Sequence, residues 1–411
     1  MAKKEKGKNE KNSVKLNIDF FELLKKFKEV ELEDVEIEVG DLEIWLQPPM
    51  LAVPPSAPLP PAVEVKPKPT EIIEVEYAPP IEEYPGKIRE VTLGATKSEG
   101  GSRSKTITIG GATSPAFYIF ERPPKNPPVI SADVFDMKVP LPKALRMHVE
   151  EVMEDPAEWA KFALEKFGAD LVTIHLISTD PLIQDTPPAK AAKTVEDVLQ
   201  AVDVPIIVGG CGDPKKDALL FEKVAEVAEG ERVMLSSLTP DMVEAKTIEK
   251  PARAAKKYGH VVLAFTALEL NKARELNRKL YDFVSKDSIV MDLTTAALGY
   301  GLEYSFTIYE RARLAALMGD PELQHPVLAG TTNAWAAREA WMKMGPEWEP
   351  RTLRGPMWEL VTSLVLLLAG VDIFMMMHPA AIRTMKEVIK QLMSPGRAKP
   401  EKIANWISVK I

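Results

Sequence analysis

Eight short apolar segments recur along the chain from residue 128 onward, and a stretch with helical spacing separates each from the next. Near-continuous apolar runs of this length are typical of parallel strands that are covered on both faces. Eight strand–helix units within about 265 residues fit a closed TIM (β/α)₈ barrel, an α/β fold, better than an open sheet. The predicted strands are 129–134, 171–177, 205–208, 233–235, 261–264, 289–291, 326–328 and 373–376.

The segments ahead of these strands differ from them in composition. Helical spacing and then alternation of apolar and acidic residues predict a small docking element at the N-terminus. A linker follows that holds twelve of the 35 prolines, and we expect it to be extended because proline fixes φ and lacks an N–H donor. Two β-prone runs then predict a hairpin that closes the bottom of the barrel. The predicted parts are a docking element 1–47, a linker 48–87, a hairpin at 89–94 and 105–110 within a barrel domain 88–395, and a tail 396–411.

Charge and cysteine content exclude several classes of protein. A net charge of −8 argues against a general nucleic-acid binder, which needs a basic face. The single cysteine, Cys211, cannot form an intramolecular disulfide or hold an iron–sulfur cluster within this chain alone. Residues 360–377 are apolar, but Gly370 and Asp372 interrupt them, which indicates a buried helix and strand rather than a membrane span. Because the Lys- and Glu-rich start is no secretory signal, we expect a cytoplasmic protein.

Candidate binding residues follow the predicted strands, where the sites of (β/α)₈ barrels lie. Hydroxyls and amides dominate these positions, which suits hydrogen bonding to a large ligand with polar edges. No strand carries a lysine and no metal-ligand motif such as His-x-His is present, so we predict neither a catalytic residue nor a metal site. The predicted cofactor-binding residues are Ser178, Thr179, Asp180, Thr294, Thr295, Thr331, Thr332, Asn333 and His378.

Other residues at the strand ends have two interpretations each. Asp133 and Asp292 either bind neighbouring backbone N–H groups or contact a ligand. His175 is either a hydrogen-bonded rim residue or a catalytic one. The Gly-Gly-Cys-Gly run at 209–212 forms a tight turn or a phosphate loop, with its cysteine packed or nucleophilic. The methionines at 375–377 either pack the barrel or form an apolar bed for a flat macrocycle.

Five stretches of sequence carry a family resemblance. The longest is MDLTTAALGYGLEY at 291–304, and the others are PVISADVFD at 128–136, GADL at 168–171, VPIIVGGCGD at 204–213 and YGHVV at 258–262. With them, the chain from about residue 88 to residue 392 resembles the delta subunit of the archaeal acetyl-CoA decarbonylase/synthase complex. That family is equivalent to the small subunit of the bacterial corrinoid iron–sulfur protein.

The resemblance implies a TIM barrel related to pterin-binding methyltransferases and paired with a larger gamma-type subunit. That partner would supply a [4Fe–4S] cluster and a corrinoid-binding module, with the corrinoid (cobamide) held between the two chains. The pair would carry a methyl group between a methyl-tetrahydropterin, of the tetrahydrosarcinapterin type, and the nickel-containing acetyl-CoA synthase centre. CO dehydrogenase and acetyl-CoA synthase subunits would be further partners. The single cysteine and the missing Asp-x-His-x-x-Gly motif agree that this chain holds no complete cofactor site by itself.

Two alternatives to a corrinoid-holding subunit remain. In the first, the barrel itself binds the methyl-pterin and performs the transfer, with Asp133, Asp180, Asp292 and Asn333 binding the pterin ring. In the second, the barrel is mainly a scaffold, and the element at 1–47 docks it to the larger complex through the proline-rich linker.

Overall fold

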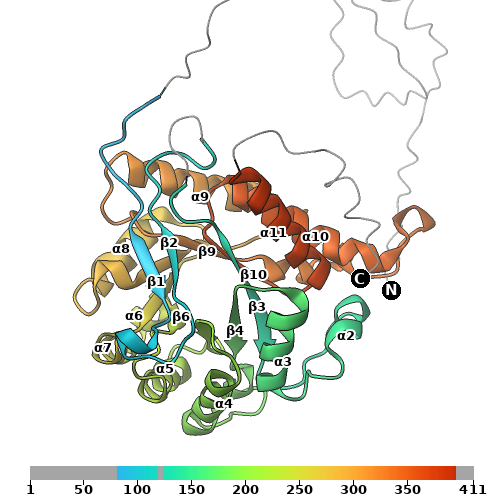
Figure 1. The fold of residues 1–411 in the computed structure, drawn as a ribbon, viewed down its shortest axis with the longest axis horizontal. Helices are drawn as coiled ribbons and strands as arrows, with labels where there is room; N and C mark the ends of the chain where they lie inside the picture. Colours follow the sequence, from blue (N-terminus) through green and yellow to red (C-terminus); the bar gives the residue numbers. More distant parts are fainter. Residues whose placement is uncertain (1–80, 119–123, 395–411) are drawn as a thin grey trace, which may run out of the picture. The chain divides into compact units, whose positions relative to one another are not determined.

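The computed structural model describes residues 81–118 and 124–394. The predicted docking element 1–47, most of the linker and the tail 396–411 lie outside the described residues. Within the described ones, eight parallel strands close into a barrel in the order β10-β3-β4-β5-β6-β7-β8-β9 (Figure 1). The ring closes where β10 pairs with β3, with Ile373 opposite Val129 and Met375 opposite Ser131. The predicted TIM barrel is confirmed.

All eight predicted strands are present, with shifted ends. The second predicted strand ends at His175 rather than at residue 177, because Ile177–Thr179 form a short 3-10 helix, η3, in which the Thr179 hydroxyl donates to Leu176 O at 2.7 Å. The strands are β3 Val129–Phe135, β4 Leu171–His175, β5 Ile206–Gly209, β6 Met234–Leu238, β7 Val261–Phe265, β8 Ile289–Asp292, β9 Val327–Gly330 and β10 Ile373–Met376.

Helices follow the strands and cover the outside of the barrel (Figure 1). The apolar stretch at 360–377 divides as predicted: α10 ends at Leu368, Gly370 takes φ +93°, and β10 begins at Ile373. No helix in the described ranges is long and apolar enough to cross a bilayer. The main helices are α2 Lys143–Val149, α3 Pro156–Phe162, α4 Pro188–Ala201, α5 Lys216–Val227, α6 Pro240–Glu244, α7 Glu249–Tyr258, α8 Leu270–Leu280, α9 Leu302–Leu317, α10 Arg351–Leu368 and α11 Pro379–Leu392.

An antiparallel hairpin of β1 Glu90–Leu93 and β2 Ile107–Gly110 closes the bottom of the barrel, as predicted. Its strands alternate, so one face carries four buried apolar side chains. These pack against side chains near the N-terminal ends of the barrel strands in one apolar cluster. The cluster joins Val91, Leu93, Ile107 and Ile109 of the hairpin to Val129, Leu171, Ile207, Met234, Val261, Leu263, Val290, Leu328, Ile373 and Met375 of the barrel.

The interior of the barrel becomes polar towards the C-terminal ends of the strands. On β3 and β4 the inward residues begin with Val129 and Leu171 in the apolar cluster. The next level holds Ser131 and Thr173, whose hydroxyls are 2.7 Å apart. The level above holds Asp133 and His175. The open, polar end is therefore the end opposite the hairpin.

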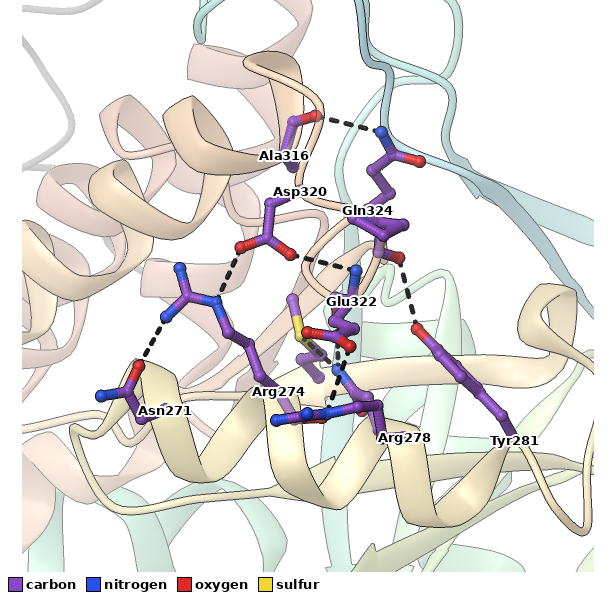
Figure 2. Close-up of polar contacts among 11 residues, drawn as sticks. Asn271, Arg274, Arg278, Tyr281, Ala316, Asp320, Glu322 and Gln324 are labelled. Atoms are coloured by element: carbon purple, nitrogen blue, oxygen red, sulfur yellow. Dashed lines mark hydrogen bonds and ion pairs between the residues drawn. The ribbon is translucent and has the colours of Figure 1, made fainter.

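A polar network fixes the connection between α9 and β9 against α8 (Figure 2). Arg274 Nε lies 2.7 Å from Asp320 Oδ2, and Arg278 Nε lies 3.1 Å from Glu322 Oε1. The Tyr281 hydroxyl and Nε2 of the buried His325 form a hydrogen bond of 2.8 Å. Because this connection leads directly into β9, the network sets where β9 enters the sheet.

The apolar cluster between the hairpin and the barrel gives a test of the fold. Replacing Leu93 by Ala should lower the free energy of unfolding by about 2–5 kcal/mol, because the side chain is fully buried and its removal leaves a cavity. Urea unfolding followed by circular dichroism measures the change. Thr92→Ala on the opposite face is the control and removes one hydroxyl pair with Thr108, for a loss of about 0.5–1.5 kcal/mol. Equal losses in both variants would show that the hairpin does not seal the barrel.

Candidate functional site

A carboxylate–imidazole pair lies at the top of the barrel interior. Asp133, at the end of β3, is 4% exposed, and its Oδ1 lies 3.1 Å from Nε2 of His175 on β4. Asp133 Oδ2 accepts a hydrogen bond from the Thr332 hydroxyl. The His175 ring stacks on Phe135 with a centroid distance of 5.2 Å. In the described chain no hydrogen bond of good geometry reaches the buried Oδ1 of Asp133, and its nearest polar neighbour is Nε2 of His175.

The connection after β9 spans the mouth and ties three strands together. It begins with the 3-10 helix η5 Thr331–Ala336. The hydroxyls of Thr331 and Thr332 both donate to Met375 O, at 2.8 and 3.1 Å. The Asn333 amide donates to Thr295 O at 3.0 Å on the connection after β8. Long connections of this kind are unusual in compact domains and are commonly functional.

Two residues near the start of α10 hold this connection in place. Gly355 lets the Trp335 ring approach so closely that a Cβ at position 355 would lie 2.1 Å from Trp335 Cζ3. The buried Arg354 guanidinium donates to the carbonyl oxygens of Glu339 and Met342. The sequence analysis did not single out these residues. Residues 331–350 are thereby fixed against α10.

Glu359 is a fully buried carboxyl in the middle of α10. Its Oε1 accepts from Met377 N at 2.7 Å, and its Oε2 accepts from His378 N at 3.0 Å, which fixes the junction of β10 and α11. Burial raises the pKa of Glu359 to about 8, even though both N–H donors favour the ionised form. The sequence signal for this residue, which we missed, is that Glu359 is the single charge in the run 355–371.

His378 caps α11 instead of facing solvent. Its Nδ1 accepts from Ala380 N at 3.1 Å, and its ring lies between Trp335 and His148, at centroid distances of 5.9 and 4.9 Å. Burial lowers the pKa of His378 to about 3, so the ring is neutral at physiological pH. Its contact with a cofactor stays a prediction, and the structure gives it a role in holding the rim.

The connection after β8 is organised by Asp292. Its Oδ1 accepts from Thr294 N at 2.8 Å and from the Tyr309 hydroxyl at 3.0 Å. Burial raises the pKa of Asp292 to about 6. Of its two interpretations, binding of a neighbouring backbone N–H is the one observed. Thr294 takes the left-handed conformation at φ +82°, and its hydroxyl donates to Thr266 O at 3.0 Å.

The connection after β4 is tightly hydrogen-bonded but exposes apolar side chains. The Ser178 backbone and hydroxyl both donate to Asp136, and Asp180 Oδ1 accepts from Leu182 N at 2.7 Å. Burial raises the pKa of Asp136. Leu182 nevertheless remains 93% exposed, which is unusual for a leucine on an ordered connection.

The Gly-Gly-Cys-Gly run forms the tight turn rather than a phosphate loop. The amides of Cys211 and Gly212 donate to the Asp217 carboxylate at 2.9 and 2.8 Å, so a protein carboxylate already occupies the anion position. Burial raises the pKa of the Cys211 thiol to about 11, which keeps it protonated. The methionines at 375–377 are buried and pack the barrel.

The nine predicted binding residues divide by exposure. Ser178, Thr179, Thr295, Thr331 and His378 are buried. Asp180, Thr294, Thr332 and Asn333 remain accessible around the mouth and can reach a ligand directly. Whether any of the nine contacts a cofactor stays a prediction. Within the described ranges, no group of three or more His, Cys, Asp or Glu side chains is placed to hold a metal ion.

Exposed apolar side chains surround the mouth. They lie on the connections that follow strands β3, β4, β8 and β9 or in the helix that comes next. Aromatic residues and methionine are enriched in protein interfaces, and an exposed apolar group of this kind marks a binding surface. We call this set the apolar collar; it consists of Met147, Leu182, Ile183, Tyr300, Tyr304, Trp341, Met342, Trp348 and Leu353.

The comparisons with known proteins agree on one family. Residues 90–388 match the family model described as CO dehydrogenase/acetyl-CoA synthase delta subunit. The chain is 54% identical to the acetyl-CoA decarbonylase/synthase complex subunit delta of Archaeoglobus fulgidus, over 89% of this chain and 82% of that protein. It is 46% identical to the subunit of the same name from Methanocaldococcus jannaschii, over 92% and 93%.

Solved structures of dihydropteroate synthases also align with the chain. The enzyme from Stenotrophomonas maltophilia matches with 14% identity and a TM-score of 0.42, over 66% of this chain and 95% of that chain. The one from Coxiella burnetii matches with 13% identity and a TM-score of 0.44, over 74% and 100%. Similarity at this level carries no inference about ligands.

The raised pKa of Glu359 predicts how stability depends on pH. A native pKa of about 8, against the ordinary glutamate pKa of about 4.5 in the unfolded chain, means that the native state binds more protons between these pH values. The free energy of unfolding of the parent should therefore fall, relative to Glu359→Gln, as pH rises from about 4.5 to about 8, and the difference should then level off. At 1.36 kcal/mol per pKa unit, the total change is on the order of 5 kcal/mol. Urea unfolding across this range measures it, and identical pH profiles for both proteins would contradict the prediction.

Proposed function

Because this chain belongs to the CO dehydrogenase/acetyl-CoA synthase delta subunit family, we propose that it is a corrinoid-holding subunit of a multi-subunit acetyl-CoA decarbonylase/synthase complex. Its direct partner is a gamma-type subunit with a [4Fe–4S] cluster and a corrinoid module. Together they carry a methyl group between a methyl-tetrahydropterin of the tetrahydrosarcinapterin type and the acetyl-CoA synthase centre. CO dehydrogenase and acetyl-CoA synthase subunits complete the complex, and the pair works in the cytoplasm.

The observation that carries this proposal is the combination at the barrel mouth of accessible polar residues with the apolar collar. A corrinoid is a broad, flat ring with amide arms at its edge. Thr332 and Asn333 on the connection after β9, and Asp180 on the opposite connection, offer hydroxyl, amide and carboxylate groups for such arms. The collar offers the apolar area that a partner subunit would cover. These hydrogen-bonding groups fit the amide arms at the edge of the ring.

The residues of this chain would bind and shield the corrinoid. A bound corrinoid supplies the cobalt that accepts and releases the methyl group. Thr332 and Asn333 would hydrogen-bond its amide arms, each bond contributing about 0.5–1.5 kcal/mol. The collar side chains would exclude water from the ring, with Trp341 and Met342 held outward by the anchoring of their connection on Arg354.

A second candidate function is that the barrel itself binds the methyl-pterin. The observation in its favour is the buried Asp133 Oδ1, which has an accepting position left beside His175 Nε2 and could use it for a pterin N–H. Another residue in this hypothesis, Asp292, is already engaged, because its carboxylate accepts from Thr294 N and from the Tyr309 hydroxyl. A pterin titration of the chain without its partner separates the two functions. The scaffold hypothesis rests on residues 1–47 and would show as loss of complex assembly when they are removed.

Cofactor content tests the proposal directly. Expressed alone, the full chain should be colourless, because one cysteine cannot hold an iron–sulfur cluster and the corrinoid module belongs to the partner. Co-expressed with a gamma-type subunit, it should co-purify with cobalt and iron. Absorption spectra and metal analysis of both preparations measure this. About one equivalent of corrinoid or cluster on the chain alone would contradict the division of roles.

The collar gives a second test. The double variant Trp341→Ala/Met342→Ala should weaken binding of the gamma-type partner by at least about tenfold, because aromatic anchors contribute most of the binding energy at interfaces. The matched control is Leu314→Ala/Met318→Ala, which removes two exposed apolar side chains at the C-terminal end of α9. Sedimentation or calorimetric titration gives the dissociation constants. A partner that binds both variants equally well does not cover the collar.

A further inference from the structure

The Asp133–His175 pair has the arrangement of a proton-transfer group. Asp133 Oδ1 lies 3.1 Å from His175 Nε2, and the carboxylate is further held by the Thr332 hydroxyl. Stacking on Phe135 fixes the plane of the imidazole. A carboxylate beside one ring nitrogen favours the tautomer that is protonated there, and it leaves the other nitrogen as the one that exchanges a proton.

The second nitrogen, Nδ1, lies at the mouth beside Gly209. A Cβ built on Gly209 would lie 2.8 Å from His175 Nδ1, so the ring fits in this position only because residue 209 is glycine. The His175 side chain is 23% exposed, in contrast to the 2% of Asp133. No hydrogen bond to Nδ1 occurs in the described part of the chain. Nδ1 is therefore the ring nitrogen of the pair that is left without a protein partner.

The polar groups next to the pair are already engaged within the protein or held protonated. Asp136 donates its backbone N–H to His175 O at 3.0 Å, while its carboxylate is occupied by Ser178. Cys211, on the connection after β5, is held protonated by burial, which raises its pKa to about 11. The interior levels below hold the hydroxyls of Ser131 and Thr173, which bond to each other.

We propose that His175 is the residue that gives a proton to the nitrogen of the methyl donor as the methyl group leaves, with Asp133 as its positioning residue. This assignment rests on the proposed function together with its second candidate, in which the N-methyl donor binds in this barrel and the corrinoid faces its mouth. An amine nitrogen is a poor leaving group unless it is protonated, so the transfer needs an acid at this place.

The step balances without an added reagent. His175 would enter the step as the imidazolium, with Nε2–H facing Asp133 and a second proton, taken up from water, on Nδ1. The bond between the methyl carbon and the donor nitrogen breaks, and its electron pair stays on the nitrogen, which takes the proton from His175 Nδ1. A bound, reduced corrinoid would supply the electron pair for the new bond to the methyl carbon. His175 is left neutral, with Nε2–H facing Asp133. In the reverse direction, Nδ1 takes the proton back from the nitrogen as that nitrogen attacks the methyl group.

A comparison of two methyl donors tests the assignment in the assembled complex. Methyl iodide needs no proton, because iodide leaves as a stable anion, whereas a methyl-tetrahydropterin does. His175→Gln should lower the rate of methyl transfer from the methyl-pterin by about 10²–10⁴-fold, the usual contribution of general acid catalysis. The rate with methyl iodide should be unchanged. Asp133→Asn should lower the methyl-pterin rate in the same selective way. The control is Asp282→Asn at an exposed carboxylate next to α8, which should change neither rate.

Each other outcome overturns the assignment. Equal loss with both donors in His175→Gln would mean that His175 holds the corrinoid or the fold, and no loss with either would mean that it plays no part. A parent complex that reacts with methyl iodide but takes no methyl group from the pterin would overturn the proposed function itself. An active parent with an unaltered ratio of rates in the variant overturns only the role of His175.

A spectroscopic readout on the full chain needs no activity. With ¹⁵N-labelled histidine, the five histidines give separate ring-nitrogen signals whose shifts distinguish protonated from unprotonated nitrogen. His175 should be the Nε2–H tautomer in the parent and a mixture of tautomers in Asp133→Asn. The signals of the distant His260 and His325 should not move. A His175 tautomer that is the same in both proteins would show that Asp133 does not orient the ring.

Discussion

Side chains on the inside of the barrel alternate with those that face the helices, and this alternation decides where polar chemistry can lie. On β3 the inward residues are Val129, Ser131 and Asp133, and the outward ones join the apolar core under the helices. The hairpin fills the bottom with Leu93 and its apolar neighbours. Polar inward residues are therefore tolerated only towards the open end, where a partner or ligand can reach them.

The mouth is a fixed surface because its longest connection is anchored on both sides. Thr332 and Asn333 tie it to Asp133 and to the connection after β8. Gly355 and Arg354 hold its other half against α10 through Trp335 and the backbone. The same anchoring keeps Asp133 in place beside His175 and turns the collar outward. Partner binding and proton transfer thus depend on the same anchored connection. The collar variant changes only the surface offered to the partner, and the His175 variant changes only the proton-transfer group.

Burial gives the titratable groups of the mouth distinct tasks. Glu359 and Asp292 are buried carboxyls with raised pKa values, and each accepts backbone N–H groups that position a connection. His378 is a buried, neutral helix cap. His175 differs from all three because part of its ring reaches solvent and one nitrogen is without a protein partner in the described chain. Exposure, more than residue type, marks it as the group able to exchange protons.

The sequence by itself determined the barrel, its eight strands, the hairpin plug and the division at Gly370, because periodicity and apolar run length are local properties of the chain. Family membership was also readable from motifs such as 291–304, and two comparisons agree with it. Only the tertiary structure decided which rim residues are accessible. Thr331 and Thr179 follow their strands as expected, but their hydroxyls donate hydrogen bonds to neighbouring backbone carbonyl oxygens. It also paired Asp133 with His175 and brought Glu359 to the end of β10. Contacts between residues far apart in the chain depend on how the strands close, and no local pattern records them.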